Sequence, residues 1–341
     1  MLSIKKKGKG RIGLVDVDSS MPNLVLMKLS AYFKKAGCNV DLIKIGFTGY
    51  DHHKRSEIEL DGSAYDRMFV SNIFTINNNL VKINNCDEVY MGGTGYSIKS
   101  TLPKEIEHCF PDYSLYPNNK HSLGFLTRGC INKCKYCFIP KKEGMLRRHS
   151  NLKEFYDSSL PKIMLLDNNF LAYKDSITLL KELKETGKKV SFKQGLDFRL
   201  INKENAKLLT ELDYDGEYIF AFDRPKDKKI IDKNLKNIWK PLVKDWQTKF
   251  FVLVGFDSTL QEDLERVYFL KKNKCLAYIM RHSKCYSSPN KPFYTDLASW
   301  CNQPGLFKNM SFKTFIKKRH ATKKRYNQTM NIIKENKLKI V

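Results

Sequence analysis

The 341-residue sequence has no apolar run of the roughly 18 residues that a membrane-spanning helix needs. Its basic opening, MLSIKKKGKG, lacks the apolar core of a secretory signal, so we expect a cytoplasmic protein with no membrane association. No zinc-finger or RNP-type module is present. Acidic residues are also few, 36 against 61 Lys and Arg, which gives a formal net charge of +25. What remains to be explained is this charge and a total of nine cysteines.

Much of the positive charge lies at the two ends of the chain. Residues 1–11 hold five Lys and Arg and no acid, and residues 311–341 hold ten with a single acid. Such ends can bind nucleic acid by neutralising phosphates, but they are equally typical of solvated, Lys-rich termini. Nucleic acid therefore stays open as a partner or substrate, and the substrate itself is unknown.

Short apolar runs that alternate with helix-period stretches predict an α/β protein. Four runs, with a helix that starts near Ser20 and Pro22 and stops at Gly37, indicate a Rossmann-like unit. These runs are 11–17, 39–45, 67–73 and 88–91. Six later runs lie at 122–127, 162–166, 189–193, 217–221, 249–254 and 275–280. Their spacing fits repeated βα units in a partial, TIM-type (β/α)6 barrel, where active sites lie at the carboxyl ends of the strands.

The same pattern divides the chain into five segments. They are a basic arm at 1–10, a Rossmann-like domain at 11–100, a Pro-rich linker at 101–120, the barrel at 121–285, and a helical cap with a basic tail at 286–341. Within the barrel, Asn202 is expected to cap one helix, and residues 258–261 (STLQ) read as a capping box.

Three cysteines, Cys130, Cys134 and Cys137, form a C-x3-C-x2-C loop directly after the first predicted barrel strand. Three thiolates leave one coordination position open, which suits catalysis better than a closed structural site. The spacing favours an iron–sulfur cluster. The alternatives are a structural zinc site, with Cys109 or His149 as a distant fourth ligand, and three unrelated thiols.

Three further cysteines raise the question of a second cluster. Cys275, Cys285 and Cys301 are separated by nine and fifteen residues, which matches no familiar ligand spacing. Cys275 opens a predicted strand, as a core residue would. We expect packing roles for them and leave a second cluster open.

The cysteine loop, which carries Tyr136 as C-x3-C-x-aromatic-C, resembles the signature of radical SAM enzymes. The resemblance implies that Cys130, Cys134 and Cys137 hold a [4Fe–4S] cluster whose open iron chelates S-adenosylmethionine (SAM), with Tyr136 packed on the adenine. It also implies that an electron from a flavodoxin- or ferredoxin-type donor splits SAM into methionine and a 5′-deoxyadenosyl radical that abstracts hydrogen from the substrate. Methyl transfer, methylthio transfer and other radical modifications stay open.

Polar residues after the later strands support this resemblance. The candidates for cofactor binding are Asp167, Asn168 and Asn169 after the second barrel strand, Gln194, Asp197 and Arg199 after the third, Asp223 after the fourth and Gly255 after the fifth. Related enzymes carry a segment similar to 167–170 (DNNF) near the SAM amino group. The Arg199 guanidinium suits a carboxylate, and the Gln194 amide suits ribose or adenine edges. Each residue could instead provide turn or cap chemistry at a strand end.

The first predicted domain resembles the cobalamin-binding-like domain of one radical SAM branch. The segment 255–263, after the fifth barrel strand, resembles the G-x-P-G-x-T-x-E-D segment of that same branch. Such domains often ligate cobalt through D-x-H-x-x-G, whereas the loop at 16–21 (DVDSSM) contains no histidine. Cobalamin is therefore the weaker cofactor expectation. A rival function from another class also fits the charge and the cysteines: a zinc-stabilised, basic nucleic-acid-binding protein without catalysis.

Overall fold

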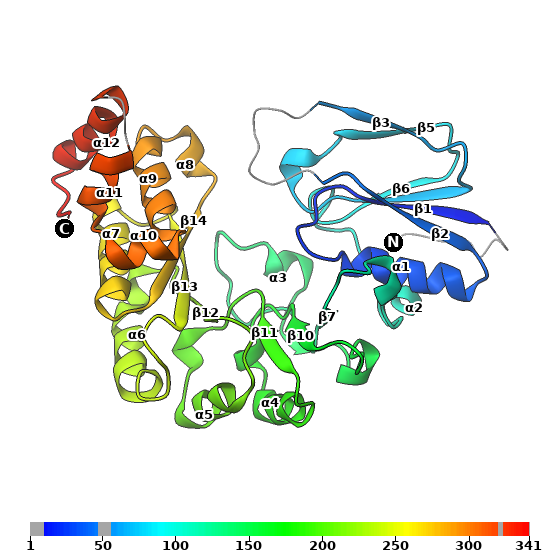
Figure 1. Cartoon of the computed structure of the whole chain (residues 1–341), viewed down its shortest axis with the longest axis horizontal. Helices are drawn as coiled ribbons and strands as arrows, with labels where there is room; N and C mark the ends of the chain where they lie inside the picture. Colours follow the sequence, from blue (N-terminus) through cyan, green and yellow to red (C-terminus); the bar gives the residue numbers. More distant parts are fainter. Residues whose placement is uncertain (1–9, 47–55, 320–322, 341) are drawn as a thin grey trace. The chain divides into compact units, whose positions relative to one another are not determined.

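The computed structural model describes residues 10–46, 56–319 and 323–340, so the predicted basic arm lies outside the described residues except for Gly10. The chain is a mixed α/β protein with parallel sheets, as predicted, and it forms two compact units (Figure 1). Unit 1 contains Met1–Leu126, Phe138–Gly144 and His149–Pro161, and unit 2 contains Thr127–Cys137, Met145–Arg148 and Lys162–Val341. Within the described ranges, no helix combines the length and apolar character that crossing a bilayer requires.

Unit 1 is built on a four-stranded parallel sheet with the order β2-β1-β4-β6. Its strands are β1 (Arg11–Asp16), β2 (Asn39–Lys44), β4 (Arg67–Ser71) and β6 (Val89–Gly92). Helix α1 (Leu24–Lys35) connects β1 to β2 and buries Leu26, Met27 and Phe33. Its N-cap is Asn23, whose side chain accepts from the backbone N–H groups of Val25 and Leu26, so the predicted start near Ser20 is wrong by about one turn.

Unit 1 also contains a pair of parallel strands that the sequence did not predict. Strands β3 (Ile58–Asp61) and β5 (Val81–Asn84) pair only with each other. Each is four residues long and half polar, so neither forms a recognisable apolar run. The other elements of this unit are α2 (Lys104–Glu107) within the predicted linker, β7 (His121–Gly124) and α3 (Ile139–Lys142).

Unit 2 carries five parallel strands, each predicted to within one residue at either end. They are β10 (Lys162–Leu165), β11 (Lys189–Phe192), β12 (Tyr218–Ala221), β13 (Thr248–Val254) and β14 (Leu276–Arg281). β10 pairs with β11, and β13 pairs with both β12 and β14. A parallel bridge between Leu196 and Phe220 joins the end of β11 to β12.

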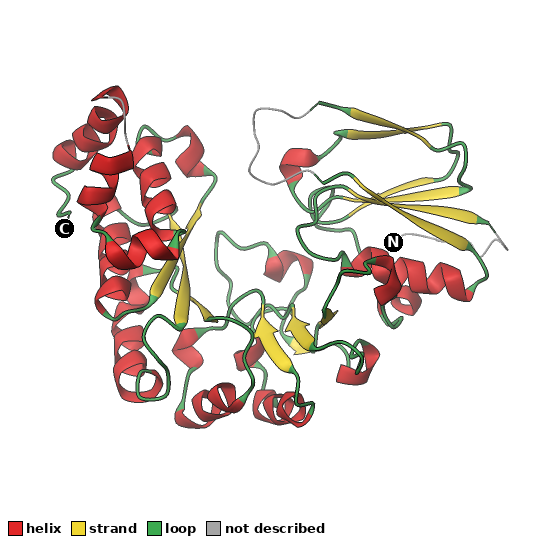
Figure 2. Cartoon of the chain, in the orientation of Figure 1, coloured by secondary structure: helices red, strands yellow, loops and turns green. Residues whose placement is uncertain are grey.

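Helices follow the strands of unit 2 and lie together on one side of them (Figure 2). They are α4 (Ser176–Glu185), α5 (Lys203–Glu211), α6 (Lys228–Asn234) and α7 (Leu260–Lys272). Asn202 caps α5 as predicted. The capping box of α7 is formed by Thr259 and Glu262, one residue later than predicted, because the Thr259 side chain is the one that accepts from the Glu262 backbone N–H.

The first predicted barrel strand, 122–127, is interrupted in the structure. β7 ends at Gly124, and the chain then forms β8 (Thr127–Arg128), which pairs antiparallel with β9 (Arg147–Arg148). The cysteine loop therefore follows one strand of a short antiparallel pair in unit 2 and not a long parallel strand.

The end of unit 2 is helical, as expected of the cap. α8 (Lys284–Ser287), α9 (Lys291–Cys301), α10 (Pro304–Asn309), α11 (Phe312–Arg319) and α12 (Lys323–Glu335) follow β14. The basic tail is docked in its last part: Ile332 and Ile333 of α12 are buried, and the Thr329 hydroxyl donates to buried Asp296 of α9 at 2.7 Å.

Candidate functional site

The cysteine loop is fixed to the end of β10 by a buried carboxylate. Asp167 is 4% exposed, and its Oδ1 accepts from both the backbone N–H and the hydroxyl of Thr127 at 2.6 Å. The next side chain, Asn168, accepts from the backbone N–H of Gly129 at 3.2 Å. Gly129 has a φ of +88°, a conformation that glycine adopts without strain. Two predicted site residues therefore position the start of the loop.

The rest of the loop is bonded to the ends of three successive strands. Side chains that follow β10, β11 and β12 each form one hydrogen bond with it: Asn169 Nδ2 donates to Cys130 Sγ (3.4 Å), Asn132 Nδ2 donates to Asp197 Oδ2 (3.3 Å), and the Tyr136 hydroxyl donates to Asp223 Oδ2 (3.0 Å). The residues that follow these three parallel strands thus lie beside the loop that carries the three cysteines.

Asn169 has an unused acceptor at this edge. Its side chain is 3% exposed, and no group in the described part of the chain donates to its Oδ1. A buried acceptor without a partner costs about 1–3 kcal/mol, so such atoms call for a ligand or another explanation. Because the amide of Asn169 already donates to Cys130, its free oxygen lies in the immediate surroundings of that sulfur.

The three cysteines of the loop are partly exposed thiols. Cys130 Sγ accepts a second hydrogen bond, from the backbone N–H of Asn132 at 3.3 Å. Burial raises the pKa of the Cys134 thiol, so a bound cation is needed to favour its thiolate at neutral pH. Across residues 10–46, 56–319 and 323–340, no three His, Cys, Asp or Glu side chains converge tightly enough to hold a single metal ion.

A buried arginine that the sequence patterns do not single out fixes the ends of β12 and β13. Arg266 of α7 is 1% exposed and donates at 2.8 Å to the carbonyls of Phe222, Asp223 and Leu253. It also pairs with buried Asp263. In the sequence, only the i,i+3 spacing of Asp263 and Arg266 on α7 indicates that these two residues could pair.

Asp223 is a partly buried acid that contacts the cysteine loop. Burial raises the pKa of Asp223, and burial together with the nearby Asp223 charge raises the pKa of Tyr136. The backbone N–H of Leu253 donates to the other carboxylate oxygen at 3.2 Å. The ring of Tyr136 is therefore held through its hydroxyl, and an edge contact with Phe256, at 5.6 Å between centroids, adds to this.

The remaining predicted residues serve other contacts or none. Arg199 forms a bidentate ion pair with Asp197, with Nε and Nη2 at 2.8 and 2.5 Å from its oxygens, so its guanidinium already has a carboxylate partner. Gln194 is exposed. Gly255 has a φ of +72°, and a Cβ there would lie 2.2 Å from Cys285 Sγ, which indicates a packing role. The cofactor contacts predicted for these three residues stay predictions.

Three cysteines near the end of unit 2 have the surroundings of core residues. Cys275, Cys285 and Cys301 are buried. Burial raises the pKa of Cys275 to about 12 and that of Cys285 to about 11, so neither thiol is readily deprotonated. This setting fits packing better than a second cluster.

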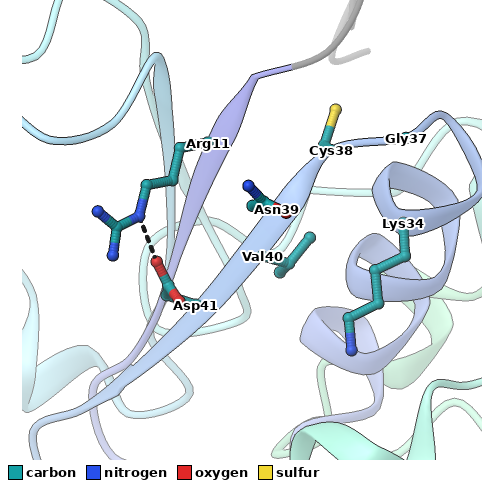
Figure 3. A pocket seen from close by; sticks show the side chains of 7 residues that line it. All are labelled: Arg11, Lys34, Gly37, Cys38, Asn39, Val40 and Asp41. Atoms are coloured by element: carbon teal, nitrogen blue, oxygen red, sulfur yellow. Dashed lines mark hydrogen bonds and ion pairs between the residues drawn. The ribbon is translucent and has the colours of Figure 1, made fainter.

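A surface pocket in unit 1 lies away from the ends of the strands where ligands of such sheets bind (Figure 3). Arg11 and Asn39, which line it, are the first residues of β1 and β2, so it opens at their amino ends. An ion pair of 2.7 Å between Arg11 and Asp41 crosses its wall. The pocket contains none of the predicted site residues.

No family model matches this chain, and no curated protein matches its sequence. The fold and the site therefore define a structural class only. It is an α/β protein with parallel sheets in which polar strand ends are bonded to a loop of three cysteines.

Proposed function

We propose that this protein is a radical SAM enzyme in which Cys130, Cys134 and Cys137 hold a [4Fe–4S] cluster. The observation that carries this proposal is the set of three hydrogen bonds between the cysteine loop and the ends of β10, β11 and β12. When bound, the cluster and SAM supply a reductively generated 5′-deoxyadenosyl radical. On this proposal the five parallel strands of unit 2 belong to the catalytic (β/α)6 barrel, and unit 1 contains the Rossmann-like domain. The electron donor is of the flavodoxin or ferredoxin type, and the cytoplasm provides the reducing conditions.

The donor set fits a cluster better than a single metal ion. A [4Fe–4S] cluster takes its thiolates at different iron atoms, so its ligands do not have to meet at one point. A structural zinc site needs four ligands around one ion, and no such set converges among the described side chains. Hydrogen bonds to a ligating sulfur adjust the potential of a cluster, and Cys130 Sγ accepts two of them.

The residues around the loop also fit an amino-acid cofactor. Asn169 Oδ1 is a buried acceptor for an ammonium group beside Cys130, and its amide holds the sulfur in place. Asp223 holds the Tyr136 hydroxyl and thereby the position of a ring that can pack on a purine.

Cobalamin is not included because the loop after β1 does not fit it. Asp18 is 2% exposed and accepts from the backbone N–H groups of Ile73 and Phe74 at 2.8 and 2.9 Å. Asp16 accepts from the Tyr116 hydroxyl at 2.8 Å. Both carboxylates are thus used within unit 1, and the loop offers no imidazole for cobalt.

Metal analysis of a matched pair of variants tests the proposal. After anaerobic reconstitution, wild type and Cys109→Ala should each contain about four iron and four sulfide per chain, whereas Cys134→Ala should lose most of both. Cys109 is a suitable control because it is another partly exposed cysteine, outside the loop. Retention of one zinc per chain after aerobic purification, with no iron uptake, would contradict the proposal and support the zinc-stabilised nucleic-acid-binding protein.

SAM binding tests the role of the second strand end. Asn169→Leu removes the orphaned acceptor with little change in volume, so SAM should bind at least tenfold more weakly to it in equilibrium dialysis. Asn309→Leu is the control, since Asn309 is an exposed residue of α10 outside the site. Equal affinities for the two variants would remove Asn169 from the SAM site.

A further inference from the structure

A cationic and aromatic cluster borders the cysteine loop at the ends of β13 and β14. It consists of Phe256, Arg281, His282, Lys284 and Tyr286, and we refer to it as the rim. The ring centroids of Phe256 and His282 lie 4.7 Å apart, and the Phe256 ring in turn contacts the Tyr136 ring of the cysteine loop. The rim is therefore joined to the proposed active site by direct ring contacts within unit 2.

Each cation of the rim lies over an aromatic ring. The Arg281 guanidinium carbon is 4.8 Å from the centroid of the Tyr286 ring, and Lys284 Nζ is 5.2 Å from that of Phe256. Among the described ion pairs, neither cation has a carboxylate partner, and Arg281 donates only to the Thr295 hydroxyl at 3.3 Å. Lys284 and Tyr286 are exposed, and Tyr286 retains 42% of its surface. These charges are thus available to an anion in solution.

The segment that carries four of the five rim residues contains no acid, and the exposed acid Asp257 follows the fifth, Phe256. Residues 281–295 hold Arg281, Lys284 and Lys291 and no Asp or Glu. The next acid, Asp296, is buried and already bonded to Thr329 and Arg319. Helices α11 and α12, which these bonds tie to α9, expose further cations that form no ion pair within the described ranges: Lys313, Lys317, Lys318, Lys324 and Arg325. α8, α9 and α12 gather at one end of unit 2 (Figure 1).

On the basis of the proposed function, we infer that the substrate is single-stranded nucleic acid and that the rim binds it beside the reacting centre. Exposed aromatic rings and guanidinium planes stack on unpaired bases, while uncompensated cations neutralise phosphates. An acidic peptide would pair with the cations but would have no bases to stack on the rings. A duplex keeps its bases stacked inside the helix, so it would gain only the electrostatic attraction between its phosphates and the cations.

Fluorescence anisotropy with labelled 12-nucleotide RNA, DNA of the same sequence and its duplex tests this inference on the full-length protein. Arg281→Gln with Lys284→Gln should weaken single-strand binding at least tenfold compared with Lys181→Gln with Lys207→Gln, which removes two exposed cations from α4 and α5. The salt dependence should also become shallower, by about 0.7 logarithmic units for each phosphate that the protein no longer neutralises. Tyr286→Ala should weaken binding by about tenfold and Tyr286→Phe by much less, because only the ring stacks. The RNA and DNA arms decide which strand is preferred.

Several outcomes would overturn the inference. They are equal affinities for the rim and control variants, equal binding of the duplex and the single strand, or full competition by polyglutamate at the same charge concentration. The assay needs neither cluster nor SAM, so its failure is separate from failure of the proposed function. If the protein cleaves SAM but does not bind nucleic acid at the rim, the proposed function stands and the inferred substrate is wrong. If it binds nucleic acid at the rim but takes up no cluster, both the radical chemistry and the inferred role of nucleic acid as its substrate are wrong.

Discussion

Replacement of Arg266 should destabilise unit 2 more than any change to an exposed charge. In Arg266→Met, Asp263 loses its buried cation and the carbonyls of Phe222, Asp223 and Leu253 lose their donor. Breaking a buried pair from one side costs about 3–5 kcal/mol. For a unit of this size, that corresponds to a fall in Tm of about 6–20 °C.

Tryptophan fluorescence can follow this unfolding selectively, because all three tryptophans, at positions 239, 246 and 300, belong to unit 2. Arg224→Met is the matched control. Its ion pair with Asp227 is partly exposed, so its loss should cost about 1 kcal/mol or less. Arg266→Met combined with Asp263→Leu should recover part of the stability, since no carboxylate is then left buried alone. A single variant within about 1 kcal/mol of wild type, or a double variant no better than the single one, would refute this reasoning.

Three further changes test individual contacts of the site by equilibrium unfolding. Thr127→Val removes one hydrogen-bond donor from buried Asp167 and should lower the free energy of unfolding by about 1–3 kcal/mol, whereas Thr127→Ser should leave it nearly unchanged. Equal destabilisation by both variants would show that the Thr127 hydroxyl does not stabilise the fold. Burial raises the pKa of Asp223 above 3.8, so its carboxyl favours folding below about pH 4 and that contribution is lost as the pH rises through the raised pKa. Asp223→Asn should therefore gain stability relative to wild type between about pH 4 and pH 7, and a constant difference would contradict this. Gly255→Ala should destabilise more than Gly216→Ala, because both have positive φ but only the former Cβ would meet neighbouring atoms; equal effects would leave backbone strain as the only cause.

The strands of unit 2 could be predicted closely because each is a compact apolar run between polar helices. β13 (Thr248–Val254), for example, alternates buried and partly exposed residues along a run with only one charge. β3 and β5 could not be predicted, because their polar residues give no such run. The start of α1 was misplaced because Ser20 and Asn23 are both good N-caps, and only the folded chain shows that Asn23 accepts from the first turn.

For the site, the sequence indicated which strand ends would carry polar residues but not how those residues pair. Asn169 and Asp223 do contact the cysteine loop. Arg199 was expected to bind a ligand, yet its nearest partner is Asp197, two residues earlier in the same turn. Thr127 and Arg266 gave little signal, because their partners lie 40 and 43 residues away along the chain and become neighbours only when the strands align.

Formation of 5′-deoxyadenosine tests the central claim most directly. The reconstituted protein is reduced under anaerobic conditions, incubated with SAM, and assayed by chromatography coupled to mass spectrometry. We expect wild type and Cys109→Ala each to release 5′-deoxyadenosine and methionine in a one-to-one ratio, and Cys134→Ala to release neither above background. Intact SAM with fully reconstituted wild type, or unchanged cleavage in Cys134→Ala, would show that the protein is not a radical SAM enzyme that uses these cysteines.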